Sequence, residues 1–356
     1  SEDFLKYDLG PQHPMRPARV ARTHEMLQCY GAMEAVEVRV PQPCPLEALG
    51  WAHSAEYIET VDRLSAGEHV PFPFRYGFGY GDNPVFPDMW DSSRLYTGAS
   101  LDAAQAIVDG AARLTMNIAG GLHHAHRDRA AGFCVFNDCV VALHKLLEKY
   151  ERVLYVDIDV HHGDGVQEAF YDSPNVLNVS IHETGQTLFP GSGFVRELGV
   201  GAGTGYSVNL PLWPYTDDEI WYWTWREGAW PIIEAFKPEA VCLEVGADAH
   251  YLDPLARLNL TAQGWIRVVE DVISLGLPTV ALGGGGYNLT TVPRMWSLMF
   301  SRVFDVPLPN DTPETFSDHD RVPTLFDEEA PAIAPYAREE ARAHARQTVA
   351  EVRERI

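Results

Sequence analysis

The stretch Val153–Gly165, V-L-Y-V-D-I-D-V-H-H-G-D-G, decides the fold class and contains the first functional candidates. It begins as a short apolar run rich in β-branched residues, which is typical of a strand buried on both faces. Side chains of a strand alternate between its faces, so Asp157, Asp159 and His161 share one face near the strand end. The two carboxylates would repel each other there unless a cation lay between them. The stretch therefore predicts a strand that ends in a divalent-metal site; the alternative is a hydrogen-bonded polar strand end.

The rest of the chain repeats a pattern of strand, loop and helix. The pattern predicts an α/β fold with a mostly parallel sheet and helices on both of its faces. In such sheets ligands bind beyond the carboxyl ends of the strands, where the polar residues of this chain gather. Besides Val153–Ile158, strands are predicted at Val36–Val40, Leu114–Ile118, Val176–Ile181, Ala240–Val245 and Thr279–Leu282. Helices are predicted at Arg16–Cys29, Ala55–Ser65, Ser93–Val108, Asn137–Lys149, Asp217–Phe236, Ala262–Ser274 and Val292–Phe304.

The composition of the 356 residues is that of a globular protein, 46% hydrophobic and 22% charged. The formal net charge of −23 disfavours direct binding to nucleic acid. No apolar run is long enough to predict a membrane span, and the first residues carry no secretory signal pattern. The five cysteines include no C-x-x-C pair. We therefore expect a cytoplasmic protein without a disulfide framework.

A third metal ligand is predicted from the strand Ala240–Val245, which is followed by Gly-Ala-Asp and so ends at Asp248. An Asp in this place is also typical of a helix cap. Two aspartates and one histidine leave a coordination position for water, which is typical of catalytic zinc sites. Mixed oxygen and nitrogen donors also suit Fe²⁺ and Mn²⁺, so the pattern alone leaves the metal open.

Two adjacent histidines, His123 and His124, follow a predicted strand in the sequence G-G-L-H-H-A-H. Imidazole titrates near neutral pH, so a histidine pair beside a metal-bound water is a candidate proton shuttle. Asp157 and Asp164 offer carboxylates that would orient the two rings. The alternative is a pair of hydrogen-bonded loop histidines. His126 has no predicted role and is expected to be exposed.

Four consecutive glycines, Gly283–Gly286, precede Tyr287. They lack both the G-x-G-x-x-G spacing and a following Lys-Ser/Thr, so they are weak evidence for a phosphate site. The Tyr287 hydroxyl is a candidate donor to a developing oxyanion, or else the ring packs on the turn. Phe133 and Phe189 lie in glycine-containing loops and, taken alone, favour a core position.

The motifs G-G-L-H-H-A, G-F-C-V-F-N-D, D-I-D-V-H-H-G-D-G-V-Q, F-P-G-S-G, G-A-D and G-G-G-G-Y occur in this order. Together they resemble the histone deacetylase family, in particular its bacterial acetoin-utilisation branch. G-P-Q-H-P-M-R-P-A-R near the start also matches, and the resemblance covers roughly Phe4 to Phe304. It implies a single arginase-like domain with a central eight-stranded parallel sheet. We expect the catalytic domain at residues 1–304 and, packed on it, an extension of loop and helix at residues 305–356. The helix Glu339–Ile356, in which Arg and Glu alternate, is expected to present a solvated face.

The resemblance implies zinc-dependent hydrolysis of N-acetyl-lysine in proteins or peptides, with release of acetate. It implies three zinc ligands, two histidines with their carboxylate partners, and a tyrosine that polarises the acetyl carbonyl. His124 is favoured as the base and acid, with His123 as its electrostatic partner. The residues concerned are Asp159, His161 and Asp248 for zinc, and His123, His124, Asp157, Asp164 and Tyr287 for catalysis.

The resemblance also implies a narrow channel for the lysine side chain. Phe133 and Phe189 would form its walls, Gly132 would accept a hydrogen bond from the substrate amide, and Asp82 would hold the peptide backbone at the rim. Arg19 would line an internal channel for acetate. Leu122 stands where some relatives have a rim aromatic, which predicts a wider mouth.

Leu255 bears on the choice of substrate. Polyamine deacetylases of the family carry an acidic residue seven positions after the last zinc ligand, and Leu255 is uncharged there. We therefore expect the protein to prefer acetyl-lysine in peptides as its substrate. The alternative is hydrolysis of acetylated polyamines or other small amides. An arginase-like ureohydrolase would need ligands for a second metal, for which D-V-H-H-G-D is a poor match. A non-catalytic acetyl-lysine binder would typically have lost a ligand or the tyrosine.

Two potassium sites are also implied by the resemblance, with several of the ligands being backbone carbonyls. The first would use Asp157, Asp159, His161, Ser180 and Ile181, and the second Phe170, Ser173, Val176 and Tyr206.

Overall fold

A parallel sheet forms the centre of the computed structural model, which describes residues 2–316 and 323–356. Within these residues the sheet has six strands, and every neighbouring pair is parallel. All six carboxyl ends therefore lie along one edge of the sheet. The strand order across the sheet is β1 (Leu114–Asn117), β6 (Thr279–Leu282), β5 (Ala240–Glu244), β2 (Val153–Asp157), β3 (Val176–Glu183) and β4 (Ser207–Leu212).

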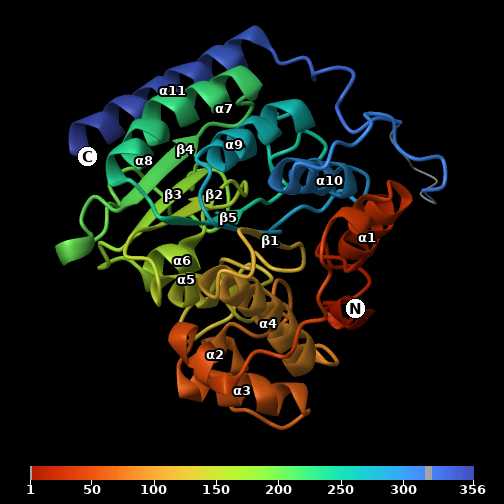
Figure 1. Cartoon of the computed structure of the whole chain (residues 1–356). Coiled ribbons are helices and arrows are strands. Elements are labelled where there is room, and N and C mark those ends of the chain that lie inside the picture. Colours follow the sequence, from red (N-terminus) through yellow and green to blue (C-terminus); the bar gives the residue numbers. More distant parts are fainter. Residues whose placement is uncertain (1, 317–322) are drawn as a thin grey trace.

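Helices cover both faces of the sheet (Figure 1). On one side lie α7 (Asp218–Thr224), α8 (Trp230–Phe236), α9 (Ala262–Ser274), α10 (Thr291–Phe304) and α11 (Pro335–Arg355), with α1 (Ala18–Cys29) beside α10. On the other lie α2 (Leu46–Ala52), α3 (Ala55–Ser65), α4 (Met89–Val108), α5 (Asp138–Leu147) and α6 (Asp164–Ala169). In the part of the chain that the structure describes, no helix combines the length and the apolar character that a bilayer crossing requires.

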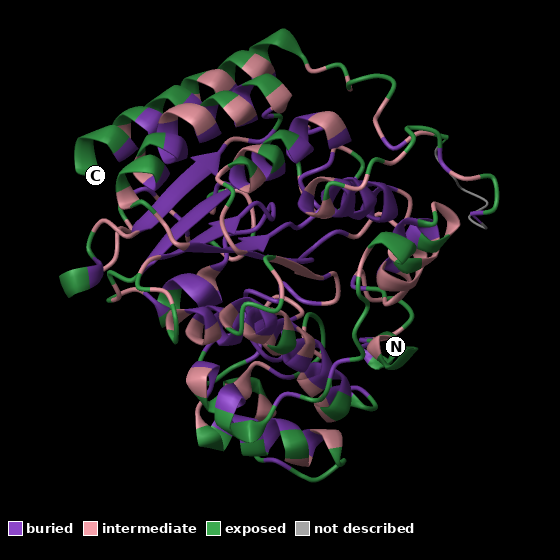
Figure 2. Ribbon diagram, viewed as in Figure 1, coloured by how far each residue is buried: buried purple, intermediate pink, exposed green. Residues whose placement is uncertain are grey.

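The two large hydrophobic cores of the described residues lie on opposite faces of the sheet. Side chains alternate along β2, so Leu154 and Val156 join the core with Trp221 and Trp265, whereas Tyr155 joins the core on the opposite face. The central strands are buried on both sides, as Figure 2 shows. This burial explains why the strands read as continuous apolar runs in the sequence.

The prediction of eight strands is wrong for the described residues. The predicted strand Val36–Val40 has no strand partner, and Val38 and Val40 are 60% and 75% exposed. Its alternation of apolar residues is a property of extended chain, and it does not by itself supply a neighbour. Conversely, β4 was missed because Pro211 interrupts its apolar pattern. Pro211 is tolerated because β4 pairs only with β3, at the edge of the sheet.

The predicted helix Asp217–Phe236 is divided by a π-helical turn at Trp225–Ala229 into α7 and α8. The carboxylate of Asp217 caps α7 by accepting the Ile220 N–H at 3.0 Å.

The C-terminal helix α11 has the predicted solvated face, and its opposite face is buried. One face of α11 is buried by Ala337, Ala341, Ala345, Thr348, Val349 and Val352, and the Thr348 hydroxyl donates to the Pro211 carbonyl of β4 at 2.9 Å. The small alanines let the helix approach the sheet edge closely. The alternating Arg and Glu of its outer face dominate the sequence pattern, so this buried face was not predicted. Residues 317–322 of the predicted extension lie outside the described residues. The domain division at residue 304 stays a prediction.

Candidate active site

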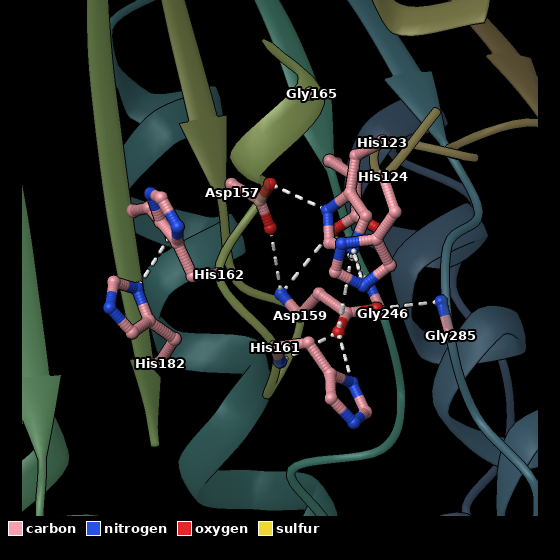
Figure 3. Close-up of polar contacts among 12 residues, drawn as sticks. His123, His124, Asp157, Asp159, His161, His162, Gly165, His182, Gly246 and Gly285 are labelled. Atoms are coloured by element: carbon pink, nitrogen blue, oxygen red, sulfur yellow. Dashed lines mark hydrogen bonds and ion pairs between the residues drawn. The ribbon is translucent and has the colours of Figure 1, made fainter. Parts of the chain in front are cut away.

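The sheet brings the predicted site residues together at its carboxyl edge. β2 ends at Asp157, which lies in register with Glu244 of β5 on one side and with Ser180 of β3 on the other. The loops after β1, β2, β5 and β6 carry the histidine pair, the metal candidates and the glycine run. Figure 3 shows His123 and His124 beside Asp157 and Asp159, and His162 and His182 directed away from them.

Asp159, His161 and Asp248 form a buried group with one potential ligand atom each, and these atoms lie within 4.8 Å of one another. The His161 Nδ1 atom is 3.0 Å from Asp159 Oδ1 and 3.1 Å from Asp248 Oδ2. Backbone amides hold the outer oxygens: Gly285 N–H donates to Asp159 Oδ2 at 2.7 Å, and Val160 N–H donates to Asp248 Oδ1 at 2.8 Å. The inner oxygens and the imidazole nitrogen therefore face one common point.

The charges of this group fit a divalent cation. Burial and the nearby charge of Asp159 raise the pKa of Asp248 to about 6, so the two carboxylates resist being ionised together. A cation between them removes this cost. A Cβ atom on Gly285 would lie 2.1 Å from the Asp248 carboxylate, so only glycine lets the backbone amide come this close. One imidazole nitrogen and two carboxylate oxygens are a zinc-type donor set.

The histidine pair lies next to this group. His123 Nδ1 is 2.8 Å from Asp157 Oδ2, and His124 Nδ1 is 2.7 Å from Asp164 Oδ1. The two Nε2 atoms are 3.0 Å apart, so they share one hydrogen bond and only one of them carries its proton. The predicted pairing of each histidine with its own aspartate is present in the structure.

The surroundings of the two rings differ in charge. Burial disfavours the charged form of His123, but the neighbouring Asp157 and Asp159 outweigh it and raise the pKa of His123. Burial, together with the positive charge on His123, lowers the pKa of His124. His123 is therefore the charged member of the pair and His124 the neutral one.

Two expectations about this loop are wrong. His126 is 7% exposed, and its ring lies 2.5 Å from Glu168 Oε2 and 3.2 Å from Asp164 Oδ2. The partners come from α6, about forty residues later in the chain, so local sequence gave no sign of them. Leu122 is 2% exposed and lines a small cavity together with Arg19, so it does not form the mouth.

Aromatic rings surround the pair and the metal candidates. The Phe189 ring is 5.0 Å from that of His124 and 6.4 Å from that of His161, and 42% of Phe189 is exposed. Phe133 meets Tyr287 edge to face at 5.6 Å, and Tyr287 is 6.4 Å from His161.

Gly132 lies directly against the His124 ring, because a Cβ atom on Gly132 would lie 2.3 Å from His124 Cδ2. Only glycine permits this approach of the loop to the histidine pair.

The remaining predicted substrate residues lie around this cluster. Asp82 is exposed, and its carbonyl is 3.2 Å from His13 Nε2. Leu255 is partly buried, and its amide donates to Asp253 at 3.0 Å. Arg19 is buried and donates to the Gly284 carbonyl at 2.5 Å. It lines the cavity of about 20 Å³ that also contains Leu122.

The two predicted potassium sets each map to neighbouring segments. Ser180 pairs with Asp157 across β2 and β3, and its hydroxyl is 2.8 Å from His182 Nδ1. Phe170 and Ser173 lie in the connection from α6 to Val176 at the start of β3. The backbone carbonyl of Tyr206 accepts the N–H of Asn178 in β3 at 2.8 Å. Ser180 and Ile181 of the first set lie in β3, and Val176 of the second set begins this strand.

Three residues that support the site were missed by sequence reasoning. Asn137 donates to the His123 and Ala125 carbonyls, and the buried Asp138 accepts the Gly121 and Leu122 amides. The third is Glu244, whose Oε2 accepts the Asp159 and Gly246 amides. The Asn-Asp pair in G-F-C-V-F-N-D was the available signal.

Glu244 also belongs to a second group of potential donors, with His123 and Asp157, whose ligand atoms lie within 4.8 Å of one another. Its Oε1 atom is buried and has no hydrogen-bond partner among the described residues. Burial and the charge of Asp157 raise the pKa of Glu244 well above the ordinary value, which favours its protonated form. His123 and Asp157 of this group already bind each other at 2.8 Å.

Comparisons with known proteins agree with this geometry. The histone deacetylase domain matches residues 13–303. Over 309 residues the chain is 40% identical to histone deacetylase 9 of Arabidopsis thaliana, covering 86% of this chain and 72% of that protein. Over 310 residues it is 39% identical to the acetoin utilization protein AcuC of Bacillus subtilis, covering 83% and 79%. The crystal structure of a histone deacetylase homologue from Aquifex aeolicus superposes with a TM-score of 0.87 at 30% identity over 98% of each chain.

The order of the motifs, the parallel sheet and the Asp–His–Asp group beside a histidine pair thus coincide with sequence and structural similarity over most of the chain. The chain therefore belongs to the histone deacetylase family and is a hydrolase that acts as a deacetylase.

Proposed function

We propose that the chain hydrolyses N-acetyl-lysine in peptides or proteins and releases acetate. One observation carries the proposal: a buried Asp–His–Asp donor set, a carboxylate-oriented histidine pair and a tyrosine converge at the carboxyl edge of one sheet. Amide hydrolysis needs an activated water, a base for its proton and a donor to the oxyanion. These three parts of the site supply those functions.

Asp159, His161 and Asp248 would hold the metal, which we propose to be zinc, with Fe²⁺ as the alternative that the same donors suit. When bound, zinc lowers the pKa of a coordinated water to about 7 and polarises an amide carbonyl. The Gly285 and Val160 amides orient the carboxylates and so direct their inner oxygens to the metal.

His124 is the proposed base and acid. Its neutral ring takes the proton of the attacking water and later gives it to the lysine nitrogen as the C–N bond breaks. Asp164 fixes the ring through Nδ1, so Nε2 is the nitrogen that would take the proton, in exchange for its hydrogen bond with His123 Nε2. His123 stays protonated beside Asp157 and stabilises negative charge near the substrate carbonyl.

Tyr287 is the proposed oxyanion donor. Its ring lies edge-on to Phe133 and within 6.4 Å of the His161 ring, and burial raises the pKa of its hydroxyl well above 10. The hydroxyl therefore keeps its proton and donates it in a hydrogen bond to the developing oxyanion.

Peptide substrates are favoured over polyamines by the surroundings of the site. Phe133 and Phe189 would enclose the aliphatic part of acetyl-lysine, with the Gly132 carbonyl accepting its amide N–H. Asp82 is exposed and free to accept backbone N–H groups of a peptide. Leu255 offers no charge to the second ammonium of a polyamine, and an unpaired desolvated charge is costly.

Three further assignments belong to the proposal. Arg19 would bind acetate in the small cavity that it lines. Potassium would bind near Ser180 and near Tyr206, where the carbonyls and hydroxyls around β3 gather. The protein would act in the cytoplasm.

A substrate screen tests the function. Acetyl-lysine peptides, acetylspermidine and a small acetyl-lysine amide are compared by kcat/KM, with metal analysis of the same samples. We expect the peptide to be the best substrate, with one divalent ion per chain. Faster hydrolysis of acetylspermidine would contradict the substrate assignment, and two metals per chain without deacetylation would favour a ureohydrolase. The variant Leu255→Glu is the matched comparison, because it should shift the preference towards acetylspermidine.

A further inference from the structure

The N-terminal motif G-P-Q-H-P-M and the residues just before it supply none of the proposed metal ligands or proton-transfer groups, although Tyr7 and Met15 line the small cavity beside Arg19. Yet this segment lies against the loop that carries Phe133. The Tyr7 hydroxyl donates to the Phe133 carbonyl at 2.6 Å and accepts the Val135 N–H at 3.2 Å. Tyr7 is 9% exposed and is wedged between Phe86 and Tyr96, with ring centroids 5.2 and 5.1 Å away. Its hydroxyl is therefore rigidly placed.

The loop held by Tyr7 has an unfavourable backbone. Gly132 and Phe133 both have positive φ angles, of 51° and 69°. Glycine adopts such angles freely, but a phenylalanine does not. A residue in this region persists only when its surroundings hold it there. The two hydrogen bonds of Tyr7 span the Phe133 carbonyl and the amide two residues on, so they restrain this turn.

His13 reaches the same phenylalanine from its side-chain face. Its ring meets Phe133 edge to face at 4.5 Å. His13 Nδ1 accepts the Met15 N–H at 3.0 Å, so its proton is on Nε2, which donates to the Asp82 carbonyl at 3.2 Å. One side chain therefore contacts both the proposed channel wall and the proposed rim loop.

We infer that Tyr7 and His13 are positioning residues that hold Phe133 and the Asp82 loop in the geometry that binds acetyl-lysine. The inference rests on the proposed function, because it needs Phe133 to line the lysine channel. Phe133 in turn abuts Tyr287, so a displaced Phe133 changes the space beside the oxyanion donor. The metal ligands have no direct contact with Tyr7 or His13 among the contacts described, so metal binding is expected to be independent of both residues.

The test is a double-mutant cycle between Tyr7→Phe and Phe133→Ala. Tyr7→Phe keeps the ring but removes both hydrogen bonds, and we expect KM for an acetyl-lysine peptide to rise about tenfold with kcat changed less than about threefold. In the Phe133→Ala background the same substitution should change KM less than about twofold, because its effect passes through Phe133. Equal effects in the two backgrounds would overturn the inference.

Tyr30→Phe is the matched control. It also removes a tyrosine hydroxyl that donates to a backbone carbonyl, that of Asp311 at 3.1 Å, and Tyr30 packs in other hydrophobic clusters than Phe133. Its KM and kcat should equal those of the parent. His13→Leu should raise KM more for the peptide than for a small acetyl-lysine amide, because it also releases the Asp82 loop.

A measurement that needs no turnover separates this inference from the proposed function. The Val135 amide donates to the Tyr7 hydroxyl, so its hydrogen exchange should quicken about tenfold in Tyr7→Phe while metal content stays at the parent level. Unchanged exchange would overturn the inference even if the parent is an active deacetylase. The third outcome is faster exchange in Tyr7→Phe together with a parent protein that hydrolyses no acetyl-lysine. Tyr7 would then support the loop, but the proposed substrate and the assignment of Phe133 to its channel would be overturned.

Discussion

The two halves of the site are built in different ways. The metal and proton-transfer groups lie at strand ends, where Asp157 and Asp159 are 0% and 1% exposed and held by backbone amides. The wall and rim come from loops, where Phe189 is 42% exposed and Phe133 has a positive φ. The reacting groups therefore inherit their positions from the sheet. What enters the site is set by loops whose geometry depends on a few hydrogen bonds, such as the two made by the Tyr7 hydroxyl.

The difference predicts how each half responds to substitution. Removing a group at a strand end should abolish chemistry without moving its neighbours, because the sheet holds them. Removing a loop contact should change substrate binding or stability and leave the chemistry intact. The following predictions test this division, from the largest expected effect to the smallest.

Asp159→Ala should abolish activity, because it removes a metal ligand and leaves Asp248 and His161 without their partner. Loss of an outer partner of a ligand typically costs about 10–100-fold in metal affinity, and loss of the ligand itself should cost more. Metal content and kcat/KM of purified protein measure the effect, with the exposed Asp62→Ala on α3 as control. Full metal occupancy in Asp159→Ala would show that the ion is held elsewhere, for example by the group of His123, Asp157 and Glu244.

Tyr287→Phe should lower kcat by about 10²–10³-fold, the effect typical of losing one oxyanion donor. The ring that packs on Phe133 is kept, so KM and metal content should remain near the parent values. Steady-state kinetics with an acetyl-lysine peptide check both statements. An unchanged kcat would place Tyr287 with the loop-built half, as packing alone.

The strand-end half was the more predictable from sequence, for a physical reason. Asp157, Asp159 and His161 follow one another at the period of a strand, so a local pattern predicted that they lie near one strand end. The structure departs from the pattern in two respects: β2 ends at Asp157, and Asp157 binds His123 and does not join the group of Asp159 and His161. Asp248 was predictable because parallel strands end at one edge. Glu244 was not, because it ends an otherwise apolar strand and its role depends on the amides of Asp159 and Gly246 beside it.

The loop-built half depends on contacts that no local pattern contains. Tyr7 binds a residue 126 positions later, and His126 binds Glu168, 42 positions later. The sequence predicted loops around Phe133 and His126, but it did not predict which residues these loops contact. The segment Val36–Val40 shows the converse error. Its sequence alternates as a strand does, but no strand of the described residues pairs with it.

Asp82→Ala should raise KM for a peptide about tenfold, because a charge-assisted hydrogen bond to a backbone N–H is worth roughly 1.5–3 kcal/mol and Asp82 is exposed to water. A small acetyl-lysine amide without a peptide backbone is the internal control, and its KM should hardly change. Equal losses for the two substrates would mean that Asp82 supports the loop and does not bind substrate.

His53 tests the loop-built half through pH. Its Nε2 accepts the Asn137 N–H at 2.9 Å, so Nδ1 carries the proton and donates to the His126 carbonyl at 2.9 Å. A second proton, on Nε2, would point at the Asn137 N–H, and burial disfavours the charged ring. Burial lowers the pKa of His53 to about 4 from its ordinary value of 6.5. Between these values the unfolded chain binds a proton that the folded chain does not.

The free energy of unfolding should therefore be fully retained above pH 6.5 and fall as the pH decreases towards 4, by about 3 kcal/mol from His53 alone. His53→Gln keeps an acceptor near the Asn137 N–H but cannot titrate. Its stability at pH 7 should be lower, and its loss on acidification should be smaller by up to about 1.4 kcal/mol per pH unit. Urea unfolding at a series of pH values measures both.

His162 and His182 also have lowered pKa values, of about 4 and about 3, so part of the acid sensitivity should remain. Parallel curves for parent and variant would show that His53 does not couple acid to the loops, and would place the acid response in the strand-end half.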